Sequence, residues 1–310
     1  MSLNPLSLFR AMPGSIAQGM IWGVMALGVY ITFRLLDFAD LTVDGSIATG
    51  AAVSVMLIRA GVSPIATLPI AFLAGALAGI VTGLLNTALG IPGILASILT
   101  QISLYSINLN IMGKANQPVS VDNYPLVVSL RYVTDGSVSR LLFFLGMIVF
   151  LLALIAVMYW YFGTEQGHAI RATGCNSNMA RAQGINTNFI KGLALMISNG
   201  LVGLCGALYG QFQGASDVNM GRGAIVIGLA AVIIGEVLFG KFASKRKLAF
   251  AFTLASVILG AVIYYMVYQF VLWLKMPSED MKLFSAIVVA IFLAIPYLKE
   301  KRTLRKGASK

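Results

Sequence analysis

The side chains best suited to chemistry lie in the stretch RLLDFADLTVDGS, which joins two long apolar runs near the start of the chain. It gathers four charged groups: Arg34, Asp37, Asp40 and Asp44. Asp44 lies deepest and precedes a small, polar segment with Ser46 and Thr49. A carboxylate there can cap the free amides of the helix that it starts, or line a polar passage beside a broken helix. The two roles are compatible, and both stay open.

A second polar stretch, TEQGHAIRATGCNSNMARAQGINTNFIKG at residues 164–192, holds the only histidine of the chain, His168. The two cysteines, Cys175 and Cys205, form no CxxC pattern, so neither a zinc site nor a disulfide framework is indicated. The chain also lacks the hydrolase motifs HExxH and GxSxG and the phosphate-cradling loop GxxxxGKS/T. An intramembrane enzyme is therefore disfavoured, and no cofactor or metal is expected.

The composition is that of a membrane protein. The chain is 58% hydrophobic and 11% charged, with a mean hydropathy of +0.87, whereas about a quarter of the residues in soluble domains are charged. A net charge of +11 would suggest nucleic acid in a soluble protein. Here the basic residues cluster beside apolar runs, which is typical of membrane topology, so nucleic-acid binding is discounted.

The apolar runs lack the alternation of barrel strands and predict an all-α, polytopic membrane bundle of about nine transmembrane helices, one of them broken or re-entrant. It forms one domain over residues 1–310. The opening MSLNPLSLFRAMPG has no cleavage-site pattern, so the first run is expected to remain as a span. The predicted spans are 14–34, 42–60, 64–89, 91–112, 140–162, 191–212, 222–240, 248–274 and 282–298.

The distribution of lysine and arginine predicts the direction of the spans. The stretch GKFASKRK at residues 240–247 and the basic tail 299–310 are both expected in the cytoplasm, and two crossings separate them. Counting back places residues 164–191 in the cytoplasm and residues 113–139 outside. Five spans before the cytosolic segment put the N-terminus outside.

Within the cytosolic segment, glycines separate two short helical candidates, HAIRAT and NSNMARAQ. Asn176 or Ser177 can cap the second candidate, and Gly184 can end it in a left-handed turn. Helices this short are marginal alone, so they need a surface to pack on. A solvated loop is the simple alternative, but small alanines beside Met179 and Ile185 favour a compact element that enters a groove on another protein.

These residues resemble the signature of permease subunits of binding-protein-dependent ATP-binding-cassette (ABC) importers, in the branched-chain-amino-acid and ribose branch. The stretches ALGVYITFRLLDFADLTVDGSIATGAAVSVML and GALAGIVTGLLNTALGIPGILASILTQISLYSINL are also similar to segments of that family. DLTVDGS and VIIGEVLFG look most like a sub-branch for aromatic amino acids and related small molecules. The signature positions matched are Gly167, Ile170, Arg171, Ala172, Gly174, Asn176, Ala180, Arg181, Gly184, Ile185 and Asn186.

The resemblance implies a type II ABC-importer-like fold in a bacterial inner membrane. It also implies a homodimer, or a heterodimer with a near relative, that couples to separate ABC ATPase subunits and receives a small solute from an extracytoplasmic binding protein. The residues expected to couple to the ATPase are Arg171, Gly174, Asn176, Met179, Ala180, Arg181, Gly184 and Ile185.

Polar side chains within the spans are candidates for the translocation path, although each can also serve as an interhelical hydrogen bond. Their concentration in residues 86–110 favours a polar lining there. Residues 211–222 predict a short outward connection or re-entrant turn, with Asp217 and Arg222 as binding-protein contacts. The expected path residues are Asp44, Ser46, Thr49, Asn86, Gln101, Tyr105 and Asn108.

The alternative to an importer is a secondary transporter that uses Asp44 and Glu236 as ion-coupling carboxylates, but no inverted repeat is evident. Glu236 is instead expected in a structural ion pair with Lys241 or Arg171. Two runs of small residues predict close helix packing: Gly75, Gly79 and Gly83, and Gly206, Gly210 and Gly214.

Overall fold

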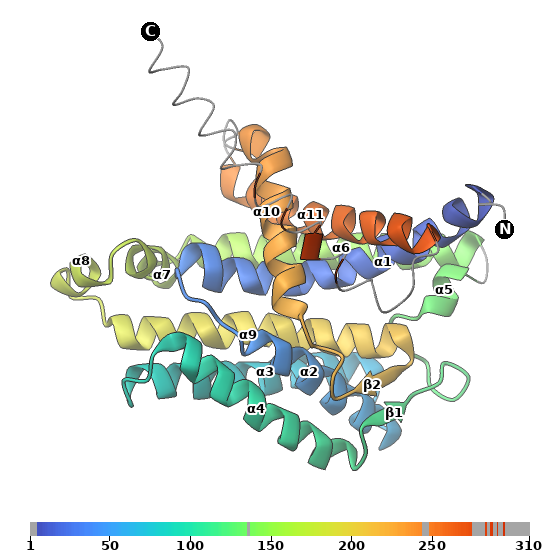
Figure 1. The fold of residues 1–310 in the computed structure, drawn as a ribbon, viewed down its shortest axis with the longest axis horizontal. Coiled ribbons are helices and arrows are strands. Elements are labelled where there is room, and N and C mark those ends of the chain that lie inside the picture. The colour runs from blue at the N-terminus through green and yellow to red at the C-terminus, as the bar shows by residue number, and fades with distance from the viewer. Residues whose placement is uncertain are drawn as a thin grey trace, which may run out of the picture.

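Helices make up nearly all of the regular structure in the computed structural model, which describes residues 5–134, 137–243 and 248–274 and a few single positions beyond (Figure 1). The predicted span 282–298 and the basic tail lie outside these ranges. The elements are α1 (Pro5–Tyr30), the π-helix η1 (Ile31–Leu35), α2 (Val43–Arg59), α3 (Pro64–Thr87), α4 (Gly93–Met112), β1 (Asn116–Pro118), α5 (Leu130–Thr134), α6 (Ser137–Phe162), α7 (Glu165–Cys175), α8 (Ser177–Ala182), α9 (Thr187–Gln213), β2 (Ala215–Asp217), α10 (Ala224–Ala243) and α11 (Ala249–Trp273).

The predicted class, a polytopic helical membrane protein, is confirmed. Six helical segments are long and apolar enough to cross a membrane, and α10 is a shorter apolar helix, so these ranges alone do not establish nine spans. Every predicted span up to residue 274 coincides with a helix. Figure 1 shows α7 and α8 at one end of the bundle. The start of α1, α5 and the antiparallel pair of strands β1 and β2 lie at the other end.

The predicted broken crossing lies between α1 and α2. η1 ends near α7, and residues 36–42 then return into the bundle without helical structure (Figure 1). α2 begins beside the middle of α9, where Ser46 Oγ donates to Asn199 Oδ1 at 2.7 Å. With 17 residues, α2 is about 25 Å long, so the non-helical segment must complete the crossing.

Small residues allow the central helices to touch through their backbones. A Cβ on Gly75 would lie 2.2 Å from the carbonyl oxygen of Asn199, and one on Gly206 would lie 1.9 Å from that of Ile47. Gly79 and Gly83 likewise face the backbone of α9, as predicted. Gly214 does not continue its run, because it ends α9 with a φ of +74°.

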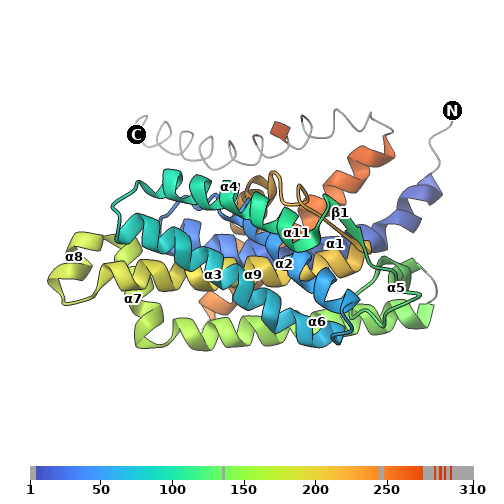
Figure 2. The same cartoon turned by 90° about the horizontal axis from the view of Figure 1, so that it is seen from below.

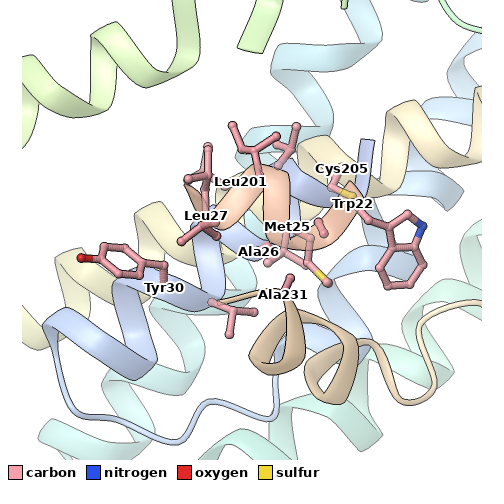
Figure 3. Close-up of a cluster of buried hydrophobic side chains, with 14 of the residues drawn as sticks. Trp22, Met25, Ala26, Leu27, Tyr30, Leu201, Cys205 and Ala231 are labelled. Atoms are coloured by element: carbon pink, nitrogen blue, oxygen red, sulfur yellow. The ribbon is translucent and has the colours of Figure 1, made fainter. Parts of the chain in front are cut away.

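The apolar core forms where α1 packs against α9, α10 and α11 (Figure 3). Met25 and Leu27 are fully buried there, and Cys205 Sγ lies 3.3 Å from the carbonyl oxygen of Ile21. Figure 2 shows α6 along one side of the bundle and α4 along the opposite side. Both helices expose many leucines and isoleucines, which suits contact with lipid.

Candidate functional site

Two helices start at the same place inside the bundle, and Asp44 joins them. Asp44 lies in the first turn of α2, but its Oδ2 accepts a hydrogen bond from Gly223 N and its Oδ1 accepts one from Ile225 N, both at 2.9 Å. These amides belong to the start of α10. Of the two roles left open for Asp44, the cap is present, but at another helix: the carboxylate caps α10 and not α2, because the chain before α10 folds back against α2 at Gly221.

A cavity of about 300 Å³ lies beside this junction. It brings together four of the predicted path residues: Asp44, Gln101, Tyr105 and Asn108. Arg222, which was predicted to contact a binding protein, also lines it. The side chains come from α2, α4 and the segment between β2 and α10, so the broken crossing is what opens a polar space between the helices.

Asn108 has an unusual environment in this cavity. Its side chain is completely buried, and neither Nδ2 nor Oδ1 has a hydrogen-bond partner among the described residues. Leaving a buried donor or acceptor unpaired costs ~1–3 kcal/mol, and native proteins rarely tolerate it without a ligand or water to bind. Asn108 therefore has an unpaired donor and an unpaired acceptor in the wall of the cavity.

The structure places the remaining predicted path residues elsewhere. Ser46 donates to Asn199, and Thr49 Oγ1 donates to the carbonyl of Gly45 one turn back, at 3.0 Å. Asn86 Nδ2 donates to the Ile91 carbonyl at 2.8 Å and so closes the α3–α4 connection. None of these three side chains lines the cavity beside Asp44.

Asp217, the other predicted binding-protein contact, lies in β2 near the end of the bundle opposite α8 (Figure 1). Its Oδ1 accepts from Asn219 N at 2.7 Å, which shapes the turn that leads back into the bundle. Nearby, the Ser120 hydroxyl and then the Arg131 guanidinium bind Asp122 and lower the pKa of that exposed carboxyl. The end of the bundle opposite α8 therefore carries the hydrogen-bonded carboxylates Asp122 and Asp217 outside the spans.

Among the described residues, the most buried carboxylate is Asp40 rather than Asp44. Asp40 is buried, its Oδ2 accepts from Asn199 Nδ2 at 2.7 Å and its Oδ1 accepts from Thr42 N at 3.0 Å. Thr42 continues the network to Thr82 at 2.7 Å, and Thr82 donates to Thr100 at 2.9 Å. This network pins the non-helical segment to α3, α4 and α9. The sequence analysis did not find this network. Its only sign in the sequence is that Thr82 and Thr100 are polar residues within apolar runs.

The predicted caps of the 164–191 segment are confirmed. Asn176 Oδ1 accepts from the amides of Asn178 and Met179 at 3.1 and 3.0 Å and so starts α8. Gly184 has a φ of +84°, as the predicted left-handed turn requires. Met179 is 63% exposed at the tip, whereas Ala180 is buried behind it. Arg181 is exposed as well and donates to Thr187 at 3.1 Å.

Like Ala180, two further predicted coupling residues, Arg171 and Gly174, face the bundle. The Arg171 guanidinium lies 4.2 Å from the ring centre of Phe250 and 5.8 Å from that of Phe162. A Cβ on Gly174 would lie 2.0 Å from the carbonyl oxygen of Leu35. Both residues therefore fix α7 against the bundle, and the outer surface of the segment is left to α8 and the turn that follows.

The predicted partner of Glu236 is wrong. Arg34 Nε lies 2.8 Å from Glu236 Oε1, so the ion pair joins η1 to α10. Arg171 is held by aromatic rings instead, and the side chain of Lys241 lies outside the described part of the structure. The pair is structural, as expected, but it ties η1, which precedes the broken crossing, to α10, whose start Asp44 caps.

The apolar helices, the broken crossing beside a polar cavity and the capped helices α7 and α8 at one end are consistent with a membrane permease. The family described as branched-chain amino acid transport system / permease component matches residues 12–296, and the chain belongs to it. It is a permease subunit of an ABC importer and a multi-pass inner-membrane protein, and such a subunit works with an ATPase and a binding protein. This assignment favours the importer over the secondary transporter.

Curated relatives agree with this assignment. The chain is 40% identical to a tyrosine transport system permease protein of Clostridioides difficile (strain R20291), over 90% of this chain and 89% of that protein. It is 28% identical to the autoinducer 2 import system permease protein LsrC of Yersinia pseudotuberculosis, over 82% and 68%. A nucleoside ABC transporter permease protein, NupC of Lactococcus lactis, is also 28% identical, over 74% and 73%. No solved structure matches the chain.

Proposed function

We propose that this permease carries an aromatic amino acid or a closely related small solute, and that the solute passes the cavity beside Asp44. The relative named for tyrosine transport supports the substrate class. The observation that carries the path is the buried amide of Asn108, which lacks a partner among the described residues. A solute moving through the cavity would supply that partner.

The charges around the cavity suit a zwitterionic amino acid. Arg222 can pair with the carboxylate of the solute, and the positive ends of α2 and α10 favour an anionic group at the same place. The Asp44 oxygens each accept one backbone hydrogen bond and keep lone pairs for an ammonium group. Both charged ends of the solute would thus find a counterpart near one junction.

The same junction can link passage to movement. Asp44 belongs to α2, whereas both of its backbone partners belong to the start of α10. Any displacement of α10 relative to α2 would break these two bonds together. The Arg34–Glu236 pair ties α10 to η1, which adjoins α7. We infer that movement of α7 and α8 reaches the cavity through η1 and α10.

Coupling to the ATPase is proposed for the exposed face of α8 and the turn after it, which carry Asn176, Met179, Arg181 and Gly184, with the half-buried Ile185 beside them. Ala180, Arg171 and Gly174 position this face from behind. Arg181→Glu is expected to abolish co-purification with the ATPase, and Arg131→Glu at the opposite end is the matched charge reversal. Equal recovery of the ATPase with Arg181→Glu would refute the docking assignment. A second permease copy or near relative completes the proposed assembly.

The path is tested by Asn108→Leu, assayed as uptake in proteoliposomes that contain the permease and its ATPase, with the binding protein added outside. Two lost hydrogen bonds of ~0.5–1.5 kcal/mol each predict a roughly 5- to 150-fold lower uptake. Asn110→Leu is the matched control, because Asn110 is exposed and its amide donates within α4 to Ser106 O. Undiminished uptake with Asn108→Leu would remove the cavity from the path.

A further inference from the structure

A second cavity, of about 490 Å³, adjoins the first one at Arg222, which lines both. We call it the aromatic cavity, because five of its twelve lining residues are aromatic and come from α1, α9 and α11. Its volume falls within the range of about 300–1,000 Å³ that is typical of small-molecule sites. The aromatic side chains that line it are Trp22, Tyr209, Tyr264, Tyr265 and Tyr268.

Trp22 differs from most buried tryptophans in the hydrogen bonding of its ring nitrogen. Its side chain is only 4% exposed, yet its ring nitrogen Nε1 has no hydrogen-bond acceptor among the described residues. Buried indole N–H groups usually find a partner. Figure 3 shows the ring at the edge of the apolar cluster, with its nitrogen turned away from Cys205. Because Trp22 also lines the aromatic cavity, its unpaired and buried donor belongs to a residue of the cavity wall.

The orientation of Trp22 is fixed by its neighbours. The ring centre lies 5.2 Å from that of Tyr209, edge to face, and 5.6 Å from that of Tyr265. Tyr209 is satisfied by contrast, because its hydroxyl accepts from Gln213 Nε2 at 2.6 Å and from Gln18 Nε2 at 3.4 Å. The rings of Tyr209 and Tyr265 therefore pack against Trp22, but its Nε1 donor stays unpaired.

We propose that the aromatic cavity holds the ring of the solute while its carboxylate lies at Arg222, and that Trp22 Nε1 donates a hydrogen bond to a hydroxyl oxygen on that ring. Trp22 is then the residue that favours a phenolic amino acid over phenylalanine. This inference rests on the proposed function and deepens it: Asn108 and Asp44 recognise the amino-acid end, and the aromatic cavity recognises the side chain.

The test measures direct binding of labelled tyrosine and phenylalanine to the permease–ATPase complex in nanodiscs, without the binding protein, so that only the permease discriminates. Trp22→Phe keeps an aromatic ring but removes the donor. One neutral hydrogen bond predicts that the preference for tyrosine falls roughly 2- to 10-fold. Trp160→Phe is the matched control, since Trp160 is an exposed residue of α6. An unchanged preference in Trp22→Phe, or an equal fall in Trp160→Phe, overturns the proposal.

A second measurement needs no variant, so it holds even if Trp22→Phe does not fold. The unaltered complex should bind tyrosine and its O-methyl ether more tightly than phenylalanine, because both oxygens accept a hydrogen bond. Equal binding of tyrosine and phenylalanine overturns the role of Trp22. Failure of the proposed function would look different: the unaltered complex, with its binding protein, would import neither aromatic amino acid.

Discussion

The helices α9 and α6 are nearly equal in length, with 27 and 26 residues, but they play opposite parts. The apolar stretch of α6 is the more hydrophobic of the two, yet only 22% of it is buried, compared with 72% for that of α9. In a membrane, lipid tails are as apolar as leucine, so hydrophobicity alone does not draw a helix inward. The more hydrophobic helix is therefore the one at the periphery.

What draws α9 to the centre is its small and polar residues. Ser198 Oγ donates to the Gly28 carbonyl at 2.8 Å, and Asn199 binds both Asp40 and Ser46. Gly203 and Gly206 let α3 and α2 approach to backbone contact. The face of α9 that carries these residues can thus satisfy polar groups that lipid cannot, and it positions the broken crossing next to the cavity.

The largest expected effect comes from filling one of these backbone contacts. In Gly206→Leu a Cβ would lie 1.9 Å from the carbonyl oxygen of Ile47, which only a backbone shift can relieve. Overpacking typically costs ~1–3 kcal/mol, and a clash with backbone should exceed that range. Thermal unfolding in detergent and the yield of monodisperse protein measure the loss.

Gly146→Leu in α6 is the matched control for this change. No atom lies within 4 Å of a Cβ built on Gly146, so the same substitution should leave stability and yield unaltered. Equal damage at both positions would mean that leucine disturbs insertion in general, and the contrast between the two helices would lose its packing explanation.

A smaller loss is expected from Asn199→Leu, which removes the donor to Asp40 and the acceptor of Ser46. A hydrogen bond to a charged group contributes ~1.5–3 kcal/mol, and Asp40 would keep Thr42 as its remaining partner. Asn188→Leu near the exposed start of α9 makes the same substitution outside the network. The free energies of unfolding of the two variants should differ by this amount; equal free energies would show that the network adds no stability.

Local features were predictable from the sequence because they depend on neighbouring residues. The spans follow from apolar runs, the caps of α8 follow from Asn176 and Gly184, and the broken crossing follows from charges between two runs. The cavity residues of α4 were also found, since polar groups are conspicuous in an apolar helix. These predictions needed no knowledge of which helices meet.

The partners that the sequence did not reveal are distant along the chain. Asp44 caps a helix about 180 residues later, Arg34 pairs with Glu236, and Asp40 is buried deeper than Asp44 because Asn199 lies opposite it. A charged side chain in an apolar stretch shows that a partner must exist. It does not show which helix brings that partner, because burial in a bundle is decided by contacts between spans.

The smallest expected effect tests whether lipid covers the outer face of α6. Leu208 in α9 is 2% exposed, whereas Leu145 in α6 is 51% exposed. In a soluble core, Leu→Ala costs ~2–5 kcal/mol, part of which is transfer from water. Because lipid replaces water here, Leu208→Ala should lose only its packing, about 1 kcal/mol, and Leu145→Ala should lose less than ~0.5 kcal/mol.

Unfolding of both variants in the same bicelles, followed by circular dichroism, makes this difference measurable. A cost for Leu145→Ala as large as that for Leu208→Ala would contradict lipid exposure, because a methyl-lined face surrounded by mobile tails leaves no cavity when a side chain is shortened. The outer face of α6 would then be packed against protein, and a second copy of the permease would be the first candidate, since the proposed assembly already contains one.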